Sequence, residues 1–206
     1  MCLIILLIYY LVVFYLQKKY IIDLSKIRRC SVLLYIVSIS FEIIYFFSHL
    51  KYFFTLGSLM DVLFIYFSFI FLYQIYSIIR VSLKKKEIVL FEKQENKVFF
   101  EFIDILKLFL FTICIFPVLS SKFIDNDFLV MIIIVVVYLI ISFIEIKINI
   151  VNISILRSIL NTLRCFFCLV ITQATNNISS TILFITVTKG YEYLVCSKQH
   201  FSNIKK

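Results

Sequence analysis

The sequence predicts an all-α integral membrane protein, folded as a bundle of seven transmembrane helices. Its 206 residues are 63% hydrophobic, with a mean hydropathy of +1.05 and only two Gly, one Pro and no Trp. This apolar fraction is far above that of an ordinary soluble domain. The apolar residues also fall into long runs, without the alternating polarity of strands in a membrane barrel.

The apolar runs have the length of membrane spans, since a helix of about 20 apolar residues crosses about 30 Å of hydrocarbon. Seven runs approach or reach this length, at 1–16, 32–49, 53–79, 100–119, 128–147, 153–173 and 178–197. The longest polar stretch, 80–97, is too short to fold alone. We therefore predict one transmembrane domain over 1–206, with a short cytosolic tail at 198–206.

The first run, MCLIILLIYYLVVFYLQKK, has two interpretations. A short apolar stretch at the N-terminus is also a feature of secretory signal peptides. This one lacks both the basic segment and the small-residue cleavage site of such a peptide. We therefore predict a retained first helix.

The runs after the first differ in how clearly they indicate spans. The second and sixth are short or interrupted by polar residues, and the third is long. Between the third and fourth lies the basic stretch SLKKKEIVLFEKQENK, at 82–97. We predict that this stretch is a solvated cytosolic loop close to the lipid bilayer.

The basic residues segregate to one set of loops and helix ends. With seven spans, sixteen of the 21 Lys and Arg residues fall in this set. They are Lys18, Lys19, Lys26, Arg28, Arg29, Arg80, Lys84, Lys85, Lys86, Lys93, Lys97, Lys147, Arg157, Lys198, Lys205 and Lys206. The opposite set holds Lys51 and Lys122. The positive-inside rule then predicts a luminal or outer N-terminus, a cytosolic C-terminus and an odd number of helices. The same segregation accounts for the net charge of +9 without nucleic acid as a partner.

Residue patterns of common catalytic or metal sites are missing from the sequence. Cys165 and Cys168 form a C-x-x-C pair with no second pair or neighbouring His, so we interpret them as small packing residues. Neither His49 nor His200 belongs to an H-x-x-x-H or a Ser/His/Asp arrangement, and the two glycines form no phosphate loop. The sequence therefore predicts no enzyme, no metal and no cofactor.

Seven ionisable residues lie at membrane depth, where each costs a few kcal/mol if it faces lipid. They are Glu42, Asp61, Lys107, Glu145, Arg164, Lys189 and Glu192. Such residues are expected to face the bundle interior and to pair with one another. Lys107, Glu145 and Lys147 lie near the cytosolic ends of their helices, so an extension toward the interface is open to them as well.

Arg164 and Lys189 are the cations least easily explained by such an extension. Lys189 and Glu192 are three residues apart on one helix, which favours an ion pair between them over a ligand-binding role for Lys189. Arg164 has no carboxylate three or four residues away, so its partner lies on another helix or is a ligand. Two interpretations stay open for Arg164: a structural ion pair with Glu42 or Asp61, and a ligand-binding role.

Four motifs resemble those of one membrane receptor family. LGSLMDVLFIYFSFIFLYQIYSIIR, at 56–80, is similar to the third helix of the receptors that retain endoplasmic-reticulum lumen proteins by their C-terminal KDEL or HDEL signals. VYLIISF, at 137–143, is similar to the fifth-helix I-Y-L-E-S of these receptors. LRCFF, at 163–167, resembles their sixth-helix Y-R-x-L-Y, and YLVCSK, at 193–198, resembles their seventh-helix Y-L-Y-x-T-K. The resemblance implies a seven-helix bundle with a luminal N-terminus, an architecture related to that of PQ-loop transporters.

Several pocket residues of that family are absent from this chain. The second-helix R-Y-x-D set falls on 44–47, where Tyr45 matches and no arginine is present. The sixth-helix tyrosines are replaced by Leu163 and Phe167, and the fifth-helix carboxylate by an isoleucine. Among the charged pocket residues that align, Arg164 is the one retained. The resemblance therefore implies an altered pocket.

The resemblance implies a receptor that binds C-terminal retrieval signals of luminal endoplasmic-reticulum proteins and returns those proteins from the Golgi. The COPI coat is a further implied partner, reached through cytosolic lysines. Acidic peptides are bound well by guanidinium groups, which points to Arg164 and, if it faces inward, Lys189. Glu42 and Asp61 are further candidate binding residues. Capture in the acidic Golgi needs a group that titrates near about pH 6, and His49 is the histidine on the luminal side.

Two other functional classes stay open. A small-solute transporter of related architecture would be favoured by proline-kinked helices in each half, but Pro117 is the one proline. A non-binding structural membrane subunit would be favoured if Arg164, Glu42 and Asp61 neutralise one another. A membrane enzyme is disfavoured because no catalytic residues cluster.

Overall fold

The structure is a computed structural model of the whole chain. It describes the backbone at residues 2–19, 24–50, 59–82, 97–122, 126–148 and 155–204. Side chains are described at 4–17, 25–44, 59–79, 102–120, 126–148, 155 and 157–192.

The fold is all-α, with seven continuous helices in the described part of the chain. They are α1 (Cys2–Lys19), α2 (Leu24–Leu50), α3 (Leu59–Ser82), α4 (Lys97–Phe109) continued by the π-helical turn η2 (Leu110–Ile115) and α5 (Phe116–Lys122), α6 (Asp127–Lys147), α7 (Ile155–Thr175) and α8 (Ile178–Ile204). The predicted helical class and helix number are therefore confirmed.

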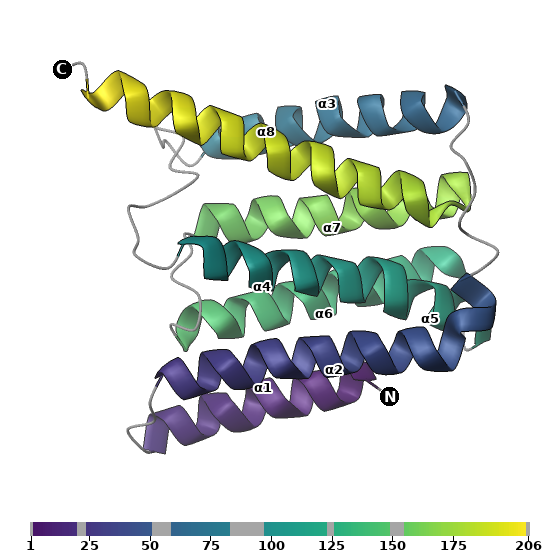
Figure 1. Cartoon of the computed structure of the whole chain (residues 1–206), viewed down its shortest axis with the longest axis vertical. Helices are drawn as coiled ribbons and strands as arrows, with labels where there is room; N and C mark the ends of the chain where they lie inside the picture. Colours follow the sequence, from purple (N-terminus) through teal and green to yellow (C-terminus); the bar gives the residue numbers. More distant parts are fainter. Residues whose placement is uncertain are drawn as a thin grey trace.

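Successive helices run in opposite directions across the bundle (Figure 1). The beginning of α1 and the end of α8 consequently lie at opposite ends of the molecule (Figure 1). The ends of α1, α3 and α6, close to Lys18, Lys19, Arg80 and Lys147 in sequence, lie at the same end of the bundle as the end of α8 (Figure 1). This is the end that the positive-inside rule predicts to face the cytosol.

Helices α7 and α4 with η2 form the centre of the bundle. α7 packs against α3, α6, α8 and η2, and η2 also contacts α2, α5 and α8. Burial differs accordingly between the helices: 67% of the apolar stretch Phe102–Ser120, in α4, η2 and α5, is buried inside the protein. For the apolar stretch Leu59–Ile79 in α3 the buried share is 22%. α3 therefore lies at an edge of the bundle, with most of its apolar side chains on the outside, and α1 lies at the opposite edge (Figure 1).

Within the described residues, four helices are long and apolar enough to cross a membrane. These stretches are Leu59–Ile79, Phe102–Ser120, Asp127–Lys147 and Arg157–Thr175. Their length and composition indicate a multi-pass membrane protein.

The π-helical turn η2 immediately precedes Pro117. A proline has no N–H to donate and its ring clashes with the carbonyl four residues back, here that of Ile113. Widening the turn relieves this clash: the Phe116 N–H donates to the carbonyl of Phe111, five residues back. All six residues of η2 are buried, so the irregular turn is enclosed by protein.

A tight connection at Asn176 and Asn177 joins α7 to α8. Asn176 adopts a left-handed conformation, with φ of 48°, which asparagine tolerates better than most residues. The Asn177 Oδ1 accepts the Ser179 N–H at 3.0 Å and thereby caps the start of α8. The two helices are therefore antiparallel neighbours, and residues equally distant from the turn lie at the same depth. Thr172 and Thr181 illustrate this register, with their hydroxyl oxygens 2.6 Å apart.

Two helices extend further than the sequence predicts. α2 begins at Leu24 instead of 32, and α8 continues to Ile204, through most of the predicted tail at 198–206. The added segments are polar, but they contain no Gly or Pro that would end a helix. Hydropathy locates the membrane-embedded part of a helix, and the helix itself continues into the polar residues beyond it.

Labelling of engineered cysteines tests the predicted orientation. In a variant whose native cysteines are replaced by serine or alanine, Lys86→Cys and Lys122→Cys place one thiol in each of the two loop sets. In sealed microsomes with the cytosolic face outward, a membrane-impermeant maleimide should label Lys86→Cys directly and Lys122→Cys only after detergent is added. The reverse pattern would contradict the orientation inferred from the basic residues.

A buried charge cluster at the centre of the bundle

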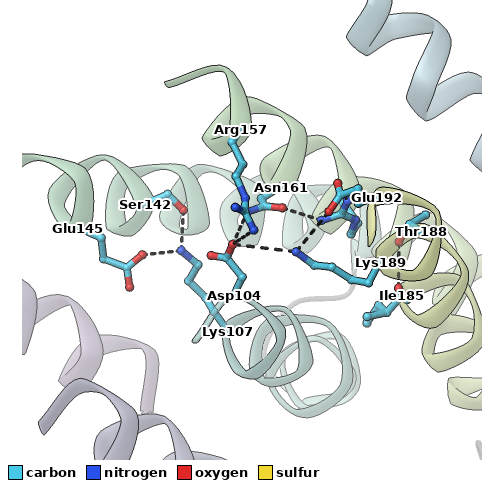
Figure 2. Close-up of polar contacts among 11 residues, drawn as sticks. Asp104, Lys107, Ser142, Glu145, Arg157, Asn161, Ile185, Thr188, Lys189 and Glu192 are labelled. Carbon is cyan, nitrogen blue, oxygen red and sulfur yellow. Dashed lines mark hydrogen bonds and ion pairs between the residues drawn. The ribbon is translucent and has the colours of Figure 1, made fainter. Parts of the chain in front are cut away.

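Seven charged side chains are buried together between α4, α6, α7 and α8 (Figure 2). We call this set the central charge cluster; it consists of Asp104, Lys107, Glu145, Arg157, Arg164, Lys189 and Glu192. The cluster holds four cations and three carboxylates. Charges removed from water in this way are tolerated when they pair and form hydrogen bonds with one another.

The first part of the central charge cluster is the ion pair between Lys107 and Glu145. The Lys107 Nζ lies 2.5 Å from the Glu145 Oε2 and donates to the Ser142 Oγ at 3.0 Å. The other carboxylate oxygen of Glu145 accepts from the hydroxyls of Tyr10, at 2.7 Å, and Tyr35, at 3.0 Å. This carboxylate therefore connects α6 to α1, α2 and α4, and its hydrogen bonds compensate for its burial.

The second part is centred on Asp104, a fully buried residue of α4. Its Oδ2 accepts from the Asn161 side chain at 2.8 Å and lies 3.7 Å from the Arg157 Nη2 and 4.0 Å from the Lys189 Nζ. Its Oδ1 has no hydrogen-bond partner among the described residues. Asp104 therefore draws cations from α7 and α8 toward α4 (Figure 2).

The third part is the ion pair between Arg164 and Glu192. Arg164 is 0% exposed, and its guanidinium contacts the Glu192 Oε1 and donates to the Asn161 Oδ1 at 2.6 Å. The Arg164 Nε and the Glu192 Oε2 both lack hydrogen-bond partners among the described residues. The pair thus uses one carboxylate oxygen, whereas a guanidinium can bind both oxygens of a carboxylate.

Lys189 completes the central charge cluster without a hydrogen bond. Its Nζ is 3.6 Å from the Glu192 Oε2 and 4.0 Å from the Asp104 Oδ2, and no described acceptor lies within hydrogen-bond distance. Lys189 and Arg164 are equally distant from the α7–α8 turn, so both cations lie at the same depth of the bundle.

A small cavity separates the Lys107 pair from Asp104. Its lining residues are Asp104, Lys107, Ser142, Glu145, Ile146, Ser158 and Asn161. It has room for about one water molecule. Since its lining carries both charges, a water that donates to a carboxylate and accepts from an ammonium suits it better than an ion of either sign.

Two further sets of polar contacts lie near the C-terminal end of α7, where it turns into α8. Asp61, in the first turn of α3, accepts from the Asn177 side chain and the Ser180 hydroxyl, both at 3.1 Å. Asp127, at the start of α6, accepts from Gln173 and Ser120. These contacts connect helix ends at the predicted luminal end, well separated from Arg164.

No protein-family model, curated protein or solved structure matches the chain. No group of three or more His, Cys, Asp and Glu side chains among the described residues is placed to hold a metal ion.

The structure brings together two of the four candidate ligand-binding residues, Arg164 and Lys189. Glu42 is buried elsewhere on α2, with no hydrogen-bond partner for its Oε2 among the described residues. Asp61 lies at the start of α3. The side chain of His49, the candidate pH sensor, lies outside the described residues.

The structural ion pair considered for Arg164 has a different partner from those expected. Glu192, and not Glu42 or Asp61, holds the guanidinium. Depth explains the difference for Asp61, which contacts Ser180, twelve residues and therefore about 18 Å before Glu192 along α8. The pairing of Lys189 with Glu192 is confirmed at 3.6 Å, although Lys189 is also close to Asp104.

Of the two positions open to Lys107 and Glu145, the interior and the interface, the structure shows the interior one. Instead of extending to the interface, both are buried and paired with each other. An opposite charge on the facing helix makes the interior position favourable, because the pair then needs no water to neutralise it.

Sequence reasoning missed Asp104, Arg157 and Asn161 as members of the site. The signal that identifies them is spacing: Arg157, Asn161 and Arg164 are four and three residues apart, so they lie on one face of α7. Asp104 and Lys107 share a face of α4 in the same way.

The Lys107–Glu145 pair provides a stability test. Lys107→Met leaves a buried carboxylate without its cation and should lower the free energy of unfolding by about 3–5 kcal/mol. The double variant Lys107→Met with Glu145→Gln removes both charges and should recover at least about 2 kcal/mol of this loss. Unfolding in lipid bicelles, followed by pulse proteolysis, measures both values.

The matched control is Lys147→Met, at an exposed lysine two residues from Glu145. This change should alter the free energy of unfolding by no more than about 0.5 kcal/mol. Equal losses in Lys107→Met and in the double variant would contradict the ion-pair interpretation.

Proposed function

We propose that the chain is a membrane receptor for the acidic C-terminal retrieval signals of luminal endoplasmic-reticulum proteins, of the KDEL or HDEL type. The observation that carries the proposal is the fully buried Arg164 guanidinium, which meets Glu192 through one carboxylate oxygen and whose Nε has no hydrogen-bond partner among the described residues. Such a group can bind the carboxylate of an acidic peptide through two parallel N–H···O bonds.

The position of Arg164 suits a ligand of this length. Arg164 lies eleven residues before the end of α7 at Thr175, which corresponds to about 17 Å along the helix. An extended tetrapeptide spans about 13–14 Å. A signal that entered at the α7–α8 turn would therefore bring its terminal carboxylate close to the guanidinium while the preceding protein chain stays outside the membrane.

The orientation and the proposed compartment are consistent with this route. The positive-inside rule predicts that the α7–α8 turn faces the lumen, where such signals are present. We propose an endoplasmic-reticulum and Golgi location, the architecture of the retrieval receptors, and COPI recognition through cytosolic lysines, all on the resemblance of the motifs around Arg164.

A structural membrane subunit is the second candidate function. Two observations favour it: each carboxylate of the central charge cluster already has a cation within 4.0 Å, and the cavity in the cluster has room for about one water. In that case the ion pairs only fix the order of the helices. Peptide entry, by contrast, requires α8 to move relative to α7.

Peptide binding distinguishes the two candidates. Purified protein should bind a peptide ending in H-D-E-L more tightly at about pH 5.5 than at about pH 7.4. Binding should require the free C-terminal carboxylate, because an amidated C-terminus presents no negative charge to Arg164. Arg164→Ala should lower the affinity at least about a hundredfold, as expected for loss of a buried charge-assisted contact.

The control variant is Lys147→Ala, which removes an exposed lysine and should leave peptide affinity unchanged. Absence of binding by folded wild-type protein under all these conditions, with Arg164→Ala only lowering stability, would support the structural subunit instead.

A further inference from the structure

We infer that Glu192 is an internal competitor for the ligand: it holds on Arg164 the place of the ligand carboxylate, and it moves to Lys189 when the ligand binds. This inference rests on the proposed receptor function. It assigns to Glu192 and Lys189 the control of how tightly an acidic signal is held.

The geometry of the Arg164–Glu192 pair is that of an exchangeable contact. One oxygen of Glu192 meets the guanidinium, while the Arg164 Nε and the Glu192 Oε2 lack hydrogen-bond partners among the described residues. A guanidinium binds a carboxylate best through two parallel N–H···O bonds. A ligand carboxylate that approached in this way would gain a hydrogen bond that Glu192 does not make.

Lys189 is placed to receive Glu192. Its Nζ is 3.6 Å from the Glu192 Oε2 and has no hydrogen-bond acceptor among the described residues, although the side chain is only 9% exposed. The two residues are three positions apart on α8, so a side-chain rotation of Glu192 brings them into contact without a change of the backbone. The buried Lys189 ammonium would then donate a hydrogen bond to the displaced Glu192 carboxylate, and the two charges would neutralise each other.

Arg164 keeps its position when Glu192 leaves. Its Nη1 donates to the Asn161 Oδ1 at 2.6 Å, and the Asn161 amide is in turn fixed by Asp104 at 2.8 Å. Asn161 therefore acts as a positioning residue that holds the guanidinium toward the ligand. When Glu192 pairs with Lys189, Asp104 still has Arg157 at 3.7 Å and Glu145 still has Lys107, so each original carboxylate keeps a cation.

Titration of the same HDEL peptide against folded variants tests the inference. Glu192→Gln keeps the size of the side chain but removes the competing charge, and it should tighten binding at least about tenfold. Glu192→Asp keeps the charge on a shorter side chain and should tighten binding less. Lys189→Met removes the second position of Glu192 and should weaken binding at least about tenfold, whereas Lys189→Arg should preserve it.

The double variant Glu192→Gln with Lys189→Met separates this role from a direct contact between Lys189 and the peptide. If Lys189 acts through Glu192, the second substitution has no further effect once Glu192 is Gln. If Lys189 binds the peptide itself, Lys189→Met weakens binding equally in both backgrounds, and the inference is overturned.

The two proposals fail in distinguishable ways. Wild-type binding that Glu192→Gln does not tighten overturns the internal competitor and leaves the receptor function in place. If neither the wild-type protein nor the Glu192→Gln variant binds the peptide, the receptor function is overturned, and the inference with it. If Glu192→Gln does not fold, unchanged affinity in Lys189→Met overturns the inference by itself.

Discussion

Neutralisation of the Arg164 guanidinium at the centre of the bundle is the constraint on which the arrangement of the helices depends. The group is fully buried in a chain with an apolar core, where an unpaired charge would cost several kcal/mol. Glu192 neutralises it from α8 and Asn161 orients it from α7. Asn161 also binds Asp104, so the same contact fixes α4 against α7. Satisfying one cation therefore sets the relative positions of three central helices.

The apolar faces alone would not select this arrangement. In lipid there is little hydrophobic driving force between helices, so packing and polar contacts decide which faces meet. Arg164 fixes which faces of α7 and α8 meet. The Lys107–Glu145 pair and its tyrosine partners fix in the same way which faces of α1, α2 and α6 meet. These contacts join α1, α2, α4, α6, α7 and α8 in the interior. In contrast, α3 exposes most of its apolar side chains at the edge and is held at its first turn by Asp61.

Hydropathy and charge predicted the helical class, the helix number and the alternation of the helix directions. Each apolar run can be recognised as a helix, and each loop assigned to one side, without knowing which helices are in contact. The partners of the buried charges depend on rotation and depth, which hydropathy does not contain. Some of this information was nevertheless present: spacing places Arg157, Asn161 and Arg164 on one face, and the short Asn176–Asn177 turn sets the depth at which α8 meets α7. The association of Asp104 with that face required the structure, since α4 is separated from α7 by a whole helix in sequence.

An exchange of the Glu192 carboxylate for that of an acidic peptide would change the surroundings of the Arg164 guanidinium. Nuclear magnetic resonance of protein in nanodiscs, labelled with ¹⁵N-arginine, observes the guanidinium directly, and the Arg164→Lys variant assigns its signal. Saturating HDEL peptide should shift the Arg164 Nε resonance, because this N–H gains a hydrogen-bond acceptor, and the amidated peptide should leave it unchanged. An Arg164 resonance unchanged by the free peptide would contradict the account and leave the Glu192 pair as a structural contact.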